Sequence, residues 1–494
     1  MFKNFRAAQA LIILLITTFL LAAKGSYLDM QLMAEDSTAA SKQAQTYGVR
    51  FMSFAEAAGV LRSLAAALPE ELVHTVAAND SSEWDHYVRA KEGETRQRLR
   101  GGDLDTLANL LLFGTSYTTA PVLSPELLKN IHTASGQSDV KDVGSQALLL
   151  RLDQLTLGIS HPGANERLKY FHDWLSTQHY QFETSQELFK VKQFLGANLV
   201  RMLREDASYA AALAEAQRLN DNGFEKRSQV FAHRGISLDT SLFPNYAIEE
   251  ALAGAKTRGL LRSGVLRVGV IGPGLDVVNK DEGWDYYPEQ TIQPFMLADS
   301  LVRLGLADAH KLEVLTFDIS DLVNHHLTNA RRRAAQGHTY VTQLPIRSDI
   351  AWNPAALRYW KRAGLAIGRA AVPLENRYPT ALDYKAVAFP VTQVLHIHPI
   401  DLDIIYQRDA IPESGKLDLI IATNMFVYYG TFEQALAMSN ISAMLRDEGL
   451  LLTNDALPEG PGLELRSVGS SEIAYSSRPH DGDRITLYRR AKLE

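Results

Sequence analysis

The sequence contains no cysteine, which excludes disulfide bonds, thiolate metal sites and cysteine nucleophiles. It also lacks an excess of basic residues, since 50 Lys and Arg stand against 57 Asp and Glu and the formal net charge is −7. A nucleic-acid partner is therefore not expected. The P-loop, G-x-S-x-G and H-E-x-x-H patterns are absent as well, so the sequence gives no sign of the enzyme classes that carry them.

The composition that remains is that of a globular protein, with 46% apolar and 22% charged residues. A chain of 494 residues is too long for one ordinary hydrophobic core, so two or more domains are expected.

The N-terminus has the pattern of a secretory signal or a single membrane anchor. Lys3 and Arg6 precede an apolar run from Ala7 to Ala23, and a core helix fits poorly at an extreme terminus beside two cations. We assign residues 1–26 to a signal peptide or membrane anchor; no clear cleavage motif decides between them. We expect the rest of the chain to be exported or anchored outside the cytoplasm, whereas an anchor of opposite orientation would leave it in the cytoplasm. Membrane contact is expected only through this segment.

The remainder divides into three parts by pattern. Residues 27–50 are polar and read as a tether, and residues 51–261 repeat apolar residues with helical period, which predicts an all-helical domain. Pro244 and the polar segment before it interrupt that pattern. Residues 262–494 then alternate strand-like and helix-like segments, which predicts an α/β domain with a parallel sheet.

Four apolar runs in this second half are predicted strands. Two segments within it, and the segment that leads into it, are predicted helices. The end of the chain is predicted to form an antiparallel hairpin. The strands are the apolar run from Val265 to the turn at Gly272, Leu312–Asp318, Leu417–Asn424 and Gly449–Asp455, the helices are Ala247–Gly259, Gln293–Leu304 and Phe432–Leu445, and the hairpin is Ser471–Arg490. The segment Leu382–Ile400 is expected to contain a further strand.

The first of these strands ends in the turn Gly272-Pro273-Gly274. Glycine permits unusual backbone angles and lets a ligand approach the main chain. A strand that ends in a glycine-rich turn ahead of a helix is typical of nucleotide pockets at the carboxyl edge of open α/β sheets. The alternative is a tight turn without a ligand.

The order of these segments resembles the class I S-adenosylmethionine-dependent methyltransferases, over roughly residues 265–490. The resemblance implies a Rossmann-like sheet and S-adenosylmethionine as cofactor. The family's glycine loop is kept in part: Gly272 and Gly274 match, whereas Val270 replaces its leading acid and Asp276 its last glycine.

Two further segments carry the resemblance. Leu417–Tyr429 is similar to the family's fourth strand and following loop, most of all in the chemotaxis receptor methyltransferases, and Leu445–Leu452 is similar to the step into the fifth strand. The residues that the resemblance implies for the cofactor are Gly272, Gly274, Asp276, Asp318 at its ribose, Asp409 at its adenine amino group, and Asn424. Those implied for the methyl acceptor are Tyr428 and Tyr429.

Capping or packing roles for Asp318, Asn424 and Tyr428 remain open at this point, and no general base is indicated. Trp284, Tyr286 and Tyr287 form either a lid over a ligand or an aromatic plug against the helical domain. His396 and His398 share a face if their segment is a strand, but a third ligand is not evident, as for His325–His326, and we predict no metal site.

Two functions follow from these patterns. The first is methyl transfer from S-adenosylmethionine to an unknown acceptor, a small molecule or a protein. The second is a non-catalytic exported or membrane-tethered binding or scaffold protein that keeps a degenerate methyltransferase fold. Val270 and Asp276 favour the second, as does the predicted export, because S-adenosylmethionine is made in the cytoplasm.

Overall fold

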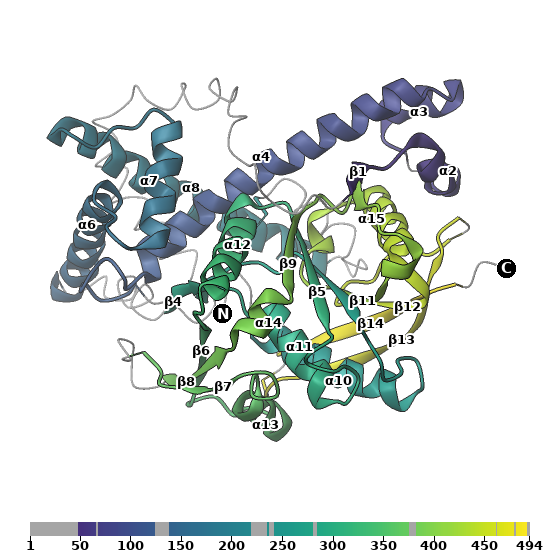
Figure 1. The fold of residues 1–494 in the computed structure, drawn as a ribbon. Coiled ribbons are helices and arrows are strands. Elements are labelled where there is room, and N and C mark those ends of the chain that lie inside the picture. Colours follow the sequence, from purple (N-terminus) through teal and green to yellow (C-terminus); the bar gives the residue numbers. More distant parts are fainter. Residues whose placement is uncertain are drawn as a thin grey trace. The chain divides into compact units, whose positions relative to one another are not determined.

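The computed structural model describes residues 48–65, 68–123, 138–218, 235–236, 242–279, 284–374, 382–460, 462–478 and 481–491 (Figure 1). The predicted signal or anchor, 1–26, lies outside the described residues, as does the predicted tether up to residue 47. Within the described part of the chain, no helix is both long enough and apolar enough to cross a membrane.

The chain folds into two compact units. The helical unit comprises the described residues of Arg100–Val230 and Val277–Glu289, and the α/β unit comprises the described residues of Thr46–Leu99, Phe231–Asp276 and Gln290–Glu494. This division differs from the predicted boundary at 261/262. The first segment after the predicted tether belongs to the α/β unit, and a short segment after the glycine turn belongs to the helical unit.

The helical unit is built from long helices and a two-stranded hairpin. Its elements are α6 (Ser138–Ser160), α7 (Glu166–Thr177), α8 (Ser185–Arg218), the end of α4 (Ser81–Phe113) and most of β3 (Asp276–Asn279) and β4 (Trp284–Gln290). Helix α6 packs against both α7 and α8. The fully buried Arg151 of α6 donates hydrogen bonds to the carbonyl oxygens of Leu111, Gly114 and Ala120, so its guanidinium orders the turn that follows α4.

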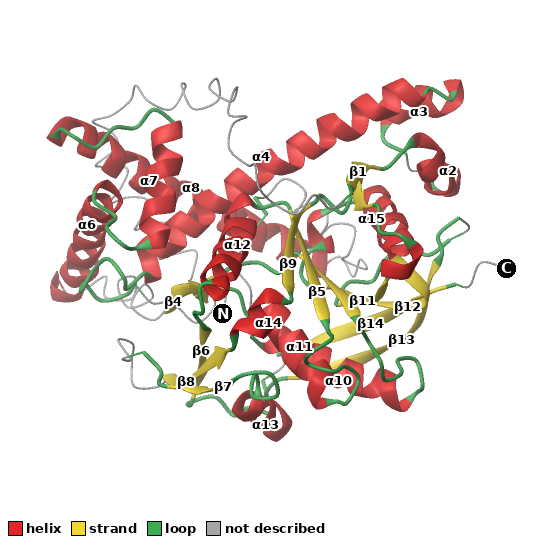
Figure 2. Cartoon of the chain, in the orientation of Figure 1, coloured by secondary structure: helices red, strands yellow, loops and turns green. Residues whose placement is uncertain are grey.

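The α/β unit contains a seven-stranded sheet in the order β13-β14-β12-β11-β2-β5-β9. Neighbours from β12 to β9 are parallel, and β14 is antiparallel to both β12 and β13. The bounds are β2 Arg267–Ile271, β5 Glu313–Asp318, β9 Ile397–Asp401, β11 Leu417–Ala422, β12 Leu445–Thr453, β13 Leu465–Ala474 and β14 Gly482–Arg490. The predicted parallel α/β sheet and closing hairpin are confirmed, and Figure 2 shows the strands in yellow.

Successive side chains of a strand point to opposite faces of the sheet, so both faces carry apolar side chains that helices can cover. Helices α10 (Phe243–Thr257), α11 (Gln293–Arg303), α12 (Asp321–Ala335) and α15 (Thr431–Met444) all contact sheet strands. Ile271, Phe317 and Ile420 lie in one core cluster with residues of α15. The strand residues are buried almost throughout, as expected for parallel strands covered on both faces.

The segment before residue 100 completes the same core. It contains β1 (Val49–Phe51), α2 (Phe54–Ser63), α3 (Glu70–Ala78) and the first part of α4, and β1 pairs with β10 (Gln407–Asp409). Trp84 is fully buried in the cluster that contains α15, and its indole N–H donates to the carbonyl oxygen of Met52 at 2.8 Å. Burial of these side chains explains why the segment folds with the sheet and not with the other helices.

An antiparallel sheet of three strands, in the order β6-β8-β7, is inserted between α12 and β9. Its elements are β6 (Tyr340–Arg347), α13 (Pro354–Arg362), β7 (Arg369–Ala371), β8 (Leu382–Phe389) and α14 (Val391–Leu395). The predicted strand region from Leu382 to Ile400 is therefore β8, α14 and β9. Two short 3-10 turns, η3 (Glu413–Gly415) and η4 (Phe426–Tyr428), flank β11.

Candidate functional site

The strand order defines where a ligand would bind. Strand β2 lies between β5 and β11, so the chain builds outward from β2 first to one side and then to the other. In open α/β sheets, ligands bind outside the carboxyl ends of the strands at such a reversal of strand order. The carboxyl ends of β2, β5, β9 and β11 are Ile271, Asp318, Asp401 and Ala422. The candidate site is therefore the set of loops that follow these four residues.

The glycine loop after β2 has the backbone that only glycine adopts easily. Gly272 and Gly274 have φ values of +60° and +66°, a region that side chains disfavour. The Gly272 N–H donates to the Phe317 carbonyl at 2.9 Å, and the Gly274 carbonyl accepts from Thr291 Oγ1 at 3.0 Å. A Cβ placed on Gly272 would come no nearer than 3.9 Å to Met425, so at this position the turn's backbone favours glycine and crowding does not.

No helix follows this turn directly, contrary to the usual strand-turn-helix arrangement. The chain enters the hairpin β3–β4, and α11 begins only at Gln293. Asp276, which stands in the place of the family's third glycine, is 1% exposed and begins β3. Val270, in the place of the family's acid, is fully buried within the sheet. The part of the loop that keeps the expected geometry is the turn Gly272–Gly274.

Asp318 ends β5 beside this turn, as predicted. Its Oδ1 accepts the Ser320 N–H at 2.8 Å, and the carboxylate is also held by the N–H groups of Gly274 and Ile319. Burial, with a smaller contribution from the charge of Asp401 on the neighbouring strand, raises the pKa of Asp318 to about 7 against these hydrogen bonds. Asp318 therefore connects the glycine loop to the end of β5 and changes its charge near neutral pH.

Asp409 does not lie at this edge. It belongs to β10 and pairs with Val49 of β1 in a separate two-stranded sheet. The acids at the carboxyl end of β9 are Asp401, its last residue, and Asp403, two residues later. The role of Asp409 at the adenine amino group stays a prediction, and the structure places Asp409 eight residues beyond the end of β9, outside the candidate site.

Asp403 was missed by the sequence analysis, and it has the environment of a binding residue. It is 2% exposed, and its Oδ1 accepts the Ile405 N–H at 2.9 Å. Its Oδ2 is buried, and no described residue donates a hydrogen bond to it. Burial raises the pKa of Asp403 to about 7 against the hydrogen bonds that its carboxylate accepts from the Ile405 and Tyr406 N–H groups. A buried acceptor without a donor costs free energy, which makes this oxygen a candidate for a ligand N–H or O–H group.

Two arginines of α4 also reach the loops at this edge. Arg96 donates to the Ile319 carbonyl at 3.1 Å and to Asp401 Oδ1 at 2.8 Å, after β5 and β9 respectively. Arg98 donates to the Tyr428 carbonyl at 2.8 Å, in the loop after β11. The sequence signal is a run of alternate arginines at 96, 98 and 100, but nothing in it indicates which sheet edge they meet.

The loop after β11 carries Asn424, Tyr428 and Tyr429. Asn424 is exposed with φ +58°, and it exchanges hydrogen bonds with Asn454 at 2.8 and 2.6 Å, which joins the ends of β11 and β12. Tyr428 is half-buried in η4. Tyr429 is 5% exposed beneath the guanidinium of Arg98, 5.5 Å from its ring centroid.

Charged side chains from the loops after β5 and β9 lie near Tyr429, which belongs to the loop after β11. Burial raises its pKa well above the ordinary value, and the nearby carboxylates of Asp403 and Asp318 raise it further while Arg98 lowers it. The structure thus brings together Gly272, Gly274, Asp318, Asp403 and the loop Asn424–Tyr429, and leaves Asp409 out.

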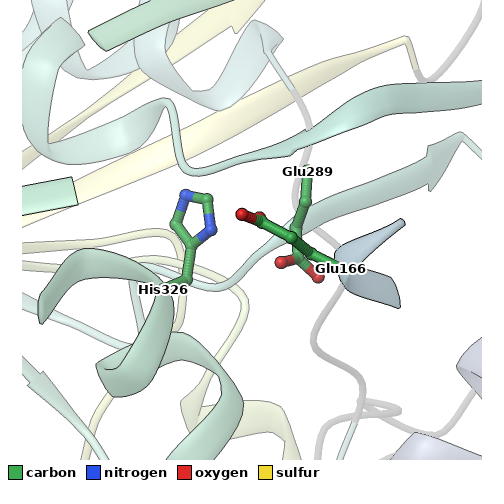
Figure 3. A group of neighbouring side chains, drawn as sticks. All are labelled: Glu166, Glu289 and His326. Carbon is green, nitrogen blue, oxygen red and sulfur yellow. The ribbon is translucent and has the colours of Figure 1, made fainter. Parts of the chain in front are cut away.

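The other predicted features lie elsewhere. His398 pairs with Glu313 near the start of β5, and His326 of α12 pairs with the Tyr340 hydroxyl at 2.8 Å. Figure 3 shows Glu166 and Glu289 of the helical unit with His326 of the α/β unit. Because these three side chains come from two separate compact units, we infer no metal site from them.

Comparisons with known proteins add little to this geometry. No family model matches the chain, and no curated protein matches it. Among solved structures, it is similar to the N-methyltransferase NodS from Bradyrhizobium japonicum WM9, with 11% identity, 51% of this chain and 100% of that chain covered, and a TM-score of 0.23.

Two further solved structures are similar at the same level. One is the magnesium protoporphyrin IX methyltransferase ChlM from Synechocystis PCC 6803 with bound S-adenosylmethionine, at 12% identity, covering 59% of this chain and 96% of that chain, with a TM-score of 0.23. The other is the CurJ carbon methyltransferase, at 13% identity, covering 88% and 98%, with a TM-score of 0.24. Scores of this size carry no argument, so the fold assignment rests on the strand order.

Proposed function

We propose that the α/β unit binds S-adenosylmethionine at the carboxyl edge of its sheet and transfers the methyl group to an acceptor, a small molecule or a protein. One observation carries the proposal. A turn with two positive-φ glycines is hydrogen-bonded to a buried carboxylate, Asp318, at the reversal of strand order. A second buried carboxylate, Asp403, supplies an acceptor oxygen to which no described residue donates.

The residues present fit the polar groups of this cofactor. Its ribose hydroxyls and adenine amino group are hydrogen-bond donors, and both require acceptors in a dry site. Asp403 Oδ2 is such an acceptor. Asp318 already accepts N–H groups of the glycine loop, and an ionised carboxylate has acceptor positions beyond these. The space beside Gly272 lets a ligand approach the main chain of the turn.

In this proposal each residue positions the cofactor and does no covalent chemistry. Gly272 and Gly274 admit the methionine part, Asp318 accepts from the ribose and Asp403 replaces Asp409 as the acceptor of the adenine amino group. When bound, S-adenosylmethionine supplies an electrophilic methyl group on a sulfonium. The chain's contribution is to hold that methyl group in line with the acceptor and to exclude water. Tyr428, half-buried after β11, borders the acceptor.

Two observations favour the non-catalytic alternative. Asp318 is engaged by three backbone N–H groups, which is also what a carboxylate does when it merely fixes a turn. Val270 and Asp276 depart from the family's pattern on either side of the glycines. A binding or scaffold protein with this fold would keep the turn and lose cofactor affinity.

Calorimetric titration of the full chain with S-adenosylmethionine and with S-adenosylhomocysteine tests the proposal. Both ligands carry the ribose and adenine, so we expect both to bind with a dissociation constant below about 100 μM, or roughly −5.5 kcal/mol. Absence of detectable heat with millimolar concentrations of either ligand would refute the cofactor site and leave the scaffold alternative. Circular dichroism on the same sample establishes that the protein is folded.

A further inference from the structure

Arg96 of α4 bridges two strand ends that carry acids of the candidate site. Its Nη1 donates to the Ile319 carbonyl at 3.1 Å, directly after Asp318, and its Nη2 donates to Asp401 Oδ1 at 2.8 Å, at the end of β9. Asp318 and Asp401 are paired residues at the ends of their strands, and the Leu402 N–H donates to the Asp318 carbonyl at 3.1 Å. Arg96 and these partners all belong to the α/β unit. One side chain thus joins β5 and β9 where their pairing ends.

The guanidinium of Arg96 is held by three different acceptors. Besides Ile319 and Asp401 it contacts Glu92, which lies one turn earlier on the same helix and accepts from Arg96 Nε at 2.5 Å. A guanidinium is planar and its donors form a rigid fork, so three acceptors from three parts of the chain fix its position. A lysine ammonium in the same place would keep the charge but would not hold this geometry. The contact is therefore specific to arginine.

The segment that carries Arg96 also supports the main chain around Asp403. The Asp403 N–H donates to Gln407 Oε1 at 2.9 Å, and the Gln407 N–H donates to the Asp403 carbonyl at 2.7 Å. Gln407 belongs to β10 and pairs with Phe51 of β1. Residues 48–99 therefore contact the loop after β9 at both of its ends, through Arg96 at the start and through β1 at the finish.

Asp401 is the acid whose charge Arg96 compensates. Partial burial raises the pKa of Asp401, and Arg96 opposes this by its charge and its hydrogen bond. The charges of Asp321 and Glu92 raise the pKa of Asp401 as well. The charge of Asp401 in turn raises the pKa of Asp318. Loss of Arg96 would thus leave a carboxylate beside Asp318 without its cation, which disfavours the ionised form of Asp318.

The same two side chains of α4 act on Asp403. Burial raises the pKa of Asp403 against its backbone hydrogen bonds, the charge of Glu92 raises it further, and the charge of Arg96 lowers it. Arg96 therefore favours the ionised form of both buried acids of the site, directly at Asp403 and through Asp401 at Asp318.

We propose that Arg96 is a positioning residue for the cofactor site. It joins the ends of β5 and β9 and compensates the charge of Asp401, so that Asp318 and Asp403 meet the same ligand as ionised acceptors. This inference rests on the proposed function, because Arg96 acts through the two carboxylates of that site and not on the ligand itself. It also extends the site beyond residues 265–490, since Arg96 comes from the N-terminal part of the α/β unit.

Calorimetric titration of the full chain with S-adenosylhomocysteine at several pH values tests the inference. Arg96→Gln removes the charge and the fork, Arg96→Lys keeps only the charge, and Arg89→Gln is the matched control. Arg89 is an exposed cation on the same helix, and its guanidinium lies 4.5 Å from the centroid of the Phe51 ring. Near neutral pH we expect affinity to fall about tenfold for Arg96→Gln, less for Arg96→Lys and not measurably for Arg89→Gln.

The pH profile of binding is the readout that a merely structural role would not move. Without Arg96, the charge of Asp401 makes Asp318 harder to ionise, and Asp403 loses a nearby cation. The pH at which binding strengthens should therefore rise by about half a unit or more. Asp401→Asn removes the negative charge beside Asp318 and should move the profile to lower pH. The proposed role requires opposite shifts from the two members of this ion pair.

Wild-type affinity in a folded Arg96→Gln would overturn the inference and leave the cofactor site in place. A loss of the same size at every pH would reduce Arg96 to a structural role and would overturn the inference as well. If Arg96→Gln does not fold, the other two variants decide. Reduced affinity in Arg96→Lys and a downward shift in Asp401→Asn support the inference, and wild-type behaviour of both contradicts it. If the wild type itself binds no S-adenosylhomocysteine, the proposed function has failed and the inference with it.

Discussion

The carboxylates at the two edges of the parallel sheet differ in their hydrogen-bond partners and in their pKa values. At the amino edge, Asp418 accepts the N–H groups of Leu266 and Arg267 at 2.7 and 3.0 Å and pairs with Arg446 at 2.7 Å. Glu313 there pairs with His398. At the carboxyl edge, Asp318 and Asp403 are buried with pKa values raised to about 7, and Asp403 Oδ2 receives no hydrogen bond from a described residue.

The difference separates structural from ligand-directed polar groups. Carboxylates with charged and N–H partners hold strands together, which is what the amino edge does with them. Asp318 has three backbone N–H donors, but Asp403 keeps a buried oxygen that receives none from a described residue. Such an oxygen costs stability, and it persists where a ligand supplies the missing donor. The unpaired oxygen of Asp403 and the strand order thus both support the proposal of a cofactor site at the carboxyl edge.

The largest predicted effect concerns the glycine turn. Gly274→Val should lower S-adenosylhomocysteine affinity by more than about a hundredfold, because the side chain fills the loop and strains a φ of +66° by about 1–2 kcal/mol. Calorimetry measures the loss. Gly337→Val is the matched control, with φ +93°, open space around its Cβ and a position beyond the far end of α12. An equal loss in both variants would mean that strain alone is responsible.

The next prediction contrasts one carboxylate from each edge. Asp318→Ala should weaken binding about ten- to a hundredfold by removing a charged hydrogen bond of roughly 1.5–3 kcal/mol. Asp418→Ala should leave affinity unchanged and lower the free energy of unfolding by about 2–4 kcal/mol, since it leaves two N–H groups and Arg446 without their partner. Titration and urea unfolding of both variants separate the two outcomes. Reduced affinity in Asp418→Ala would remove the distinction between the edges.

A smaller effect is expected from pH. The pKa of Asp403 is about 7 in the folded protein, and a ligand N–H donor favours the ionised carboxylate. Binding should therefore strengthen by about tenfold between pH 6 and pH 8 through this group. In Asp403→Asn the part of the dependence due to this residue disappears, whereas the part due to Asp318 remains. A wild-type affinity that is flat over this range would show that neither carboxylate meets the ligand.

The last prediction concerns the stability of the protein without ligand. Because the folded pKa of Asp403, about 7, exceeds the ordinary value of 3.8, the folded state binds more protons between these values. Stability from this group is complete below about pH 4 and is lost as pH rises through 7. Asp403→Asn should thus be more stable than the wild type at pH 8, by about 1–3 kcal/mol, with little difference at pH 4.5. Urea unfolding at both pH values provides the measurement.

Much of the α/β fold follows from sequence because its strands are short, apolar and bounded by turns. The runs ending at Asp318 and Asn424 predicted β5 and β11, and the pattern 471–490 predicted the closing hairpin. Residues 51–99 were predicted to belong to the helical domain, whereas the structure groups them with the α/β unit. The helical period of this segment is the same whether it packs on helices or on a sheet, and only the burial of Trp84 against Met52 and α15 distinguishes the two.

The candidate site was predicted only where a residue stands at a strand end. Gly272, Gly274 and Asp318 do, and the structure places them together. Asp403 was missed because β9 is short and contains His398, Pro399 and Asp401, so it lacks the apolar run that marks the end of a buried strand. Arg96 and Arg98 were missed because a helix surface carries no signal of the distant strands it will meet.

Hydrogen exchange of the two sheet edges, with and without saturating S-adenosylhomocysteine, tests the central claim most directly. The account predicts slower exchange in peptides that cover residues 272–276, 318–320, 401–406 and 423–429. It predicts no change in peptides that cover the starts of β5, β9 and β11, at Glu313, Ile397 and Leu417. Protection at the amino edge, or no protection at either edge at millimolar ligand, would contradict the assignment of the carboxyl edge as a cofactor site.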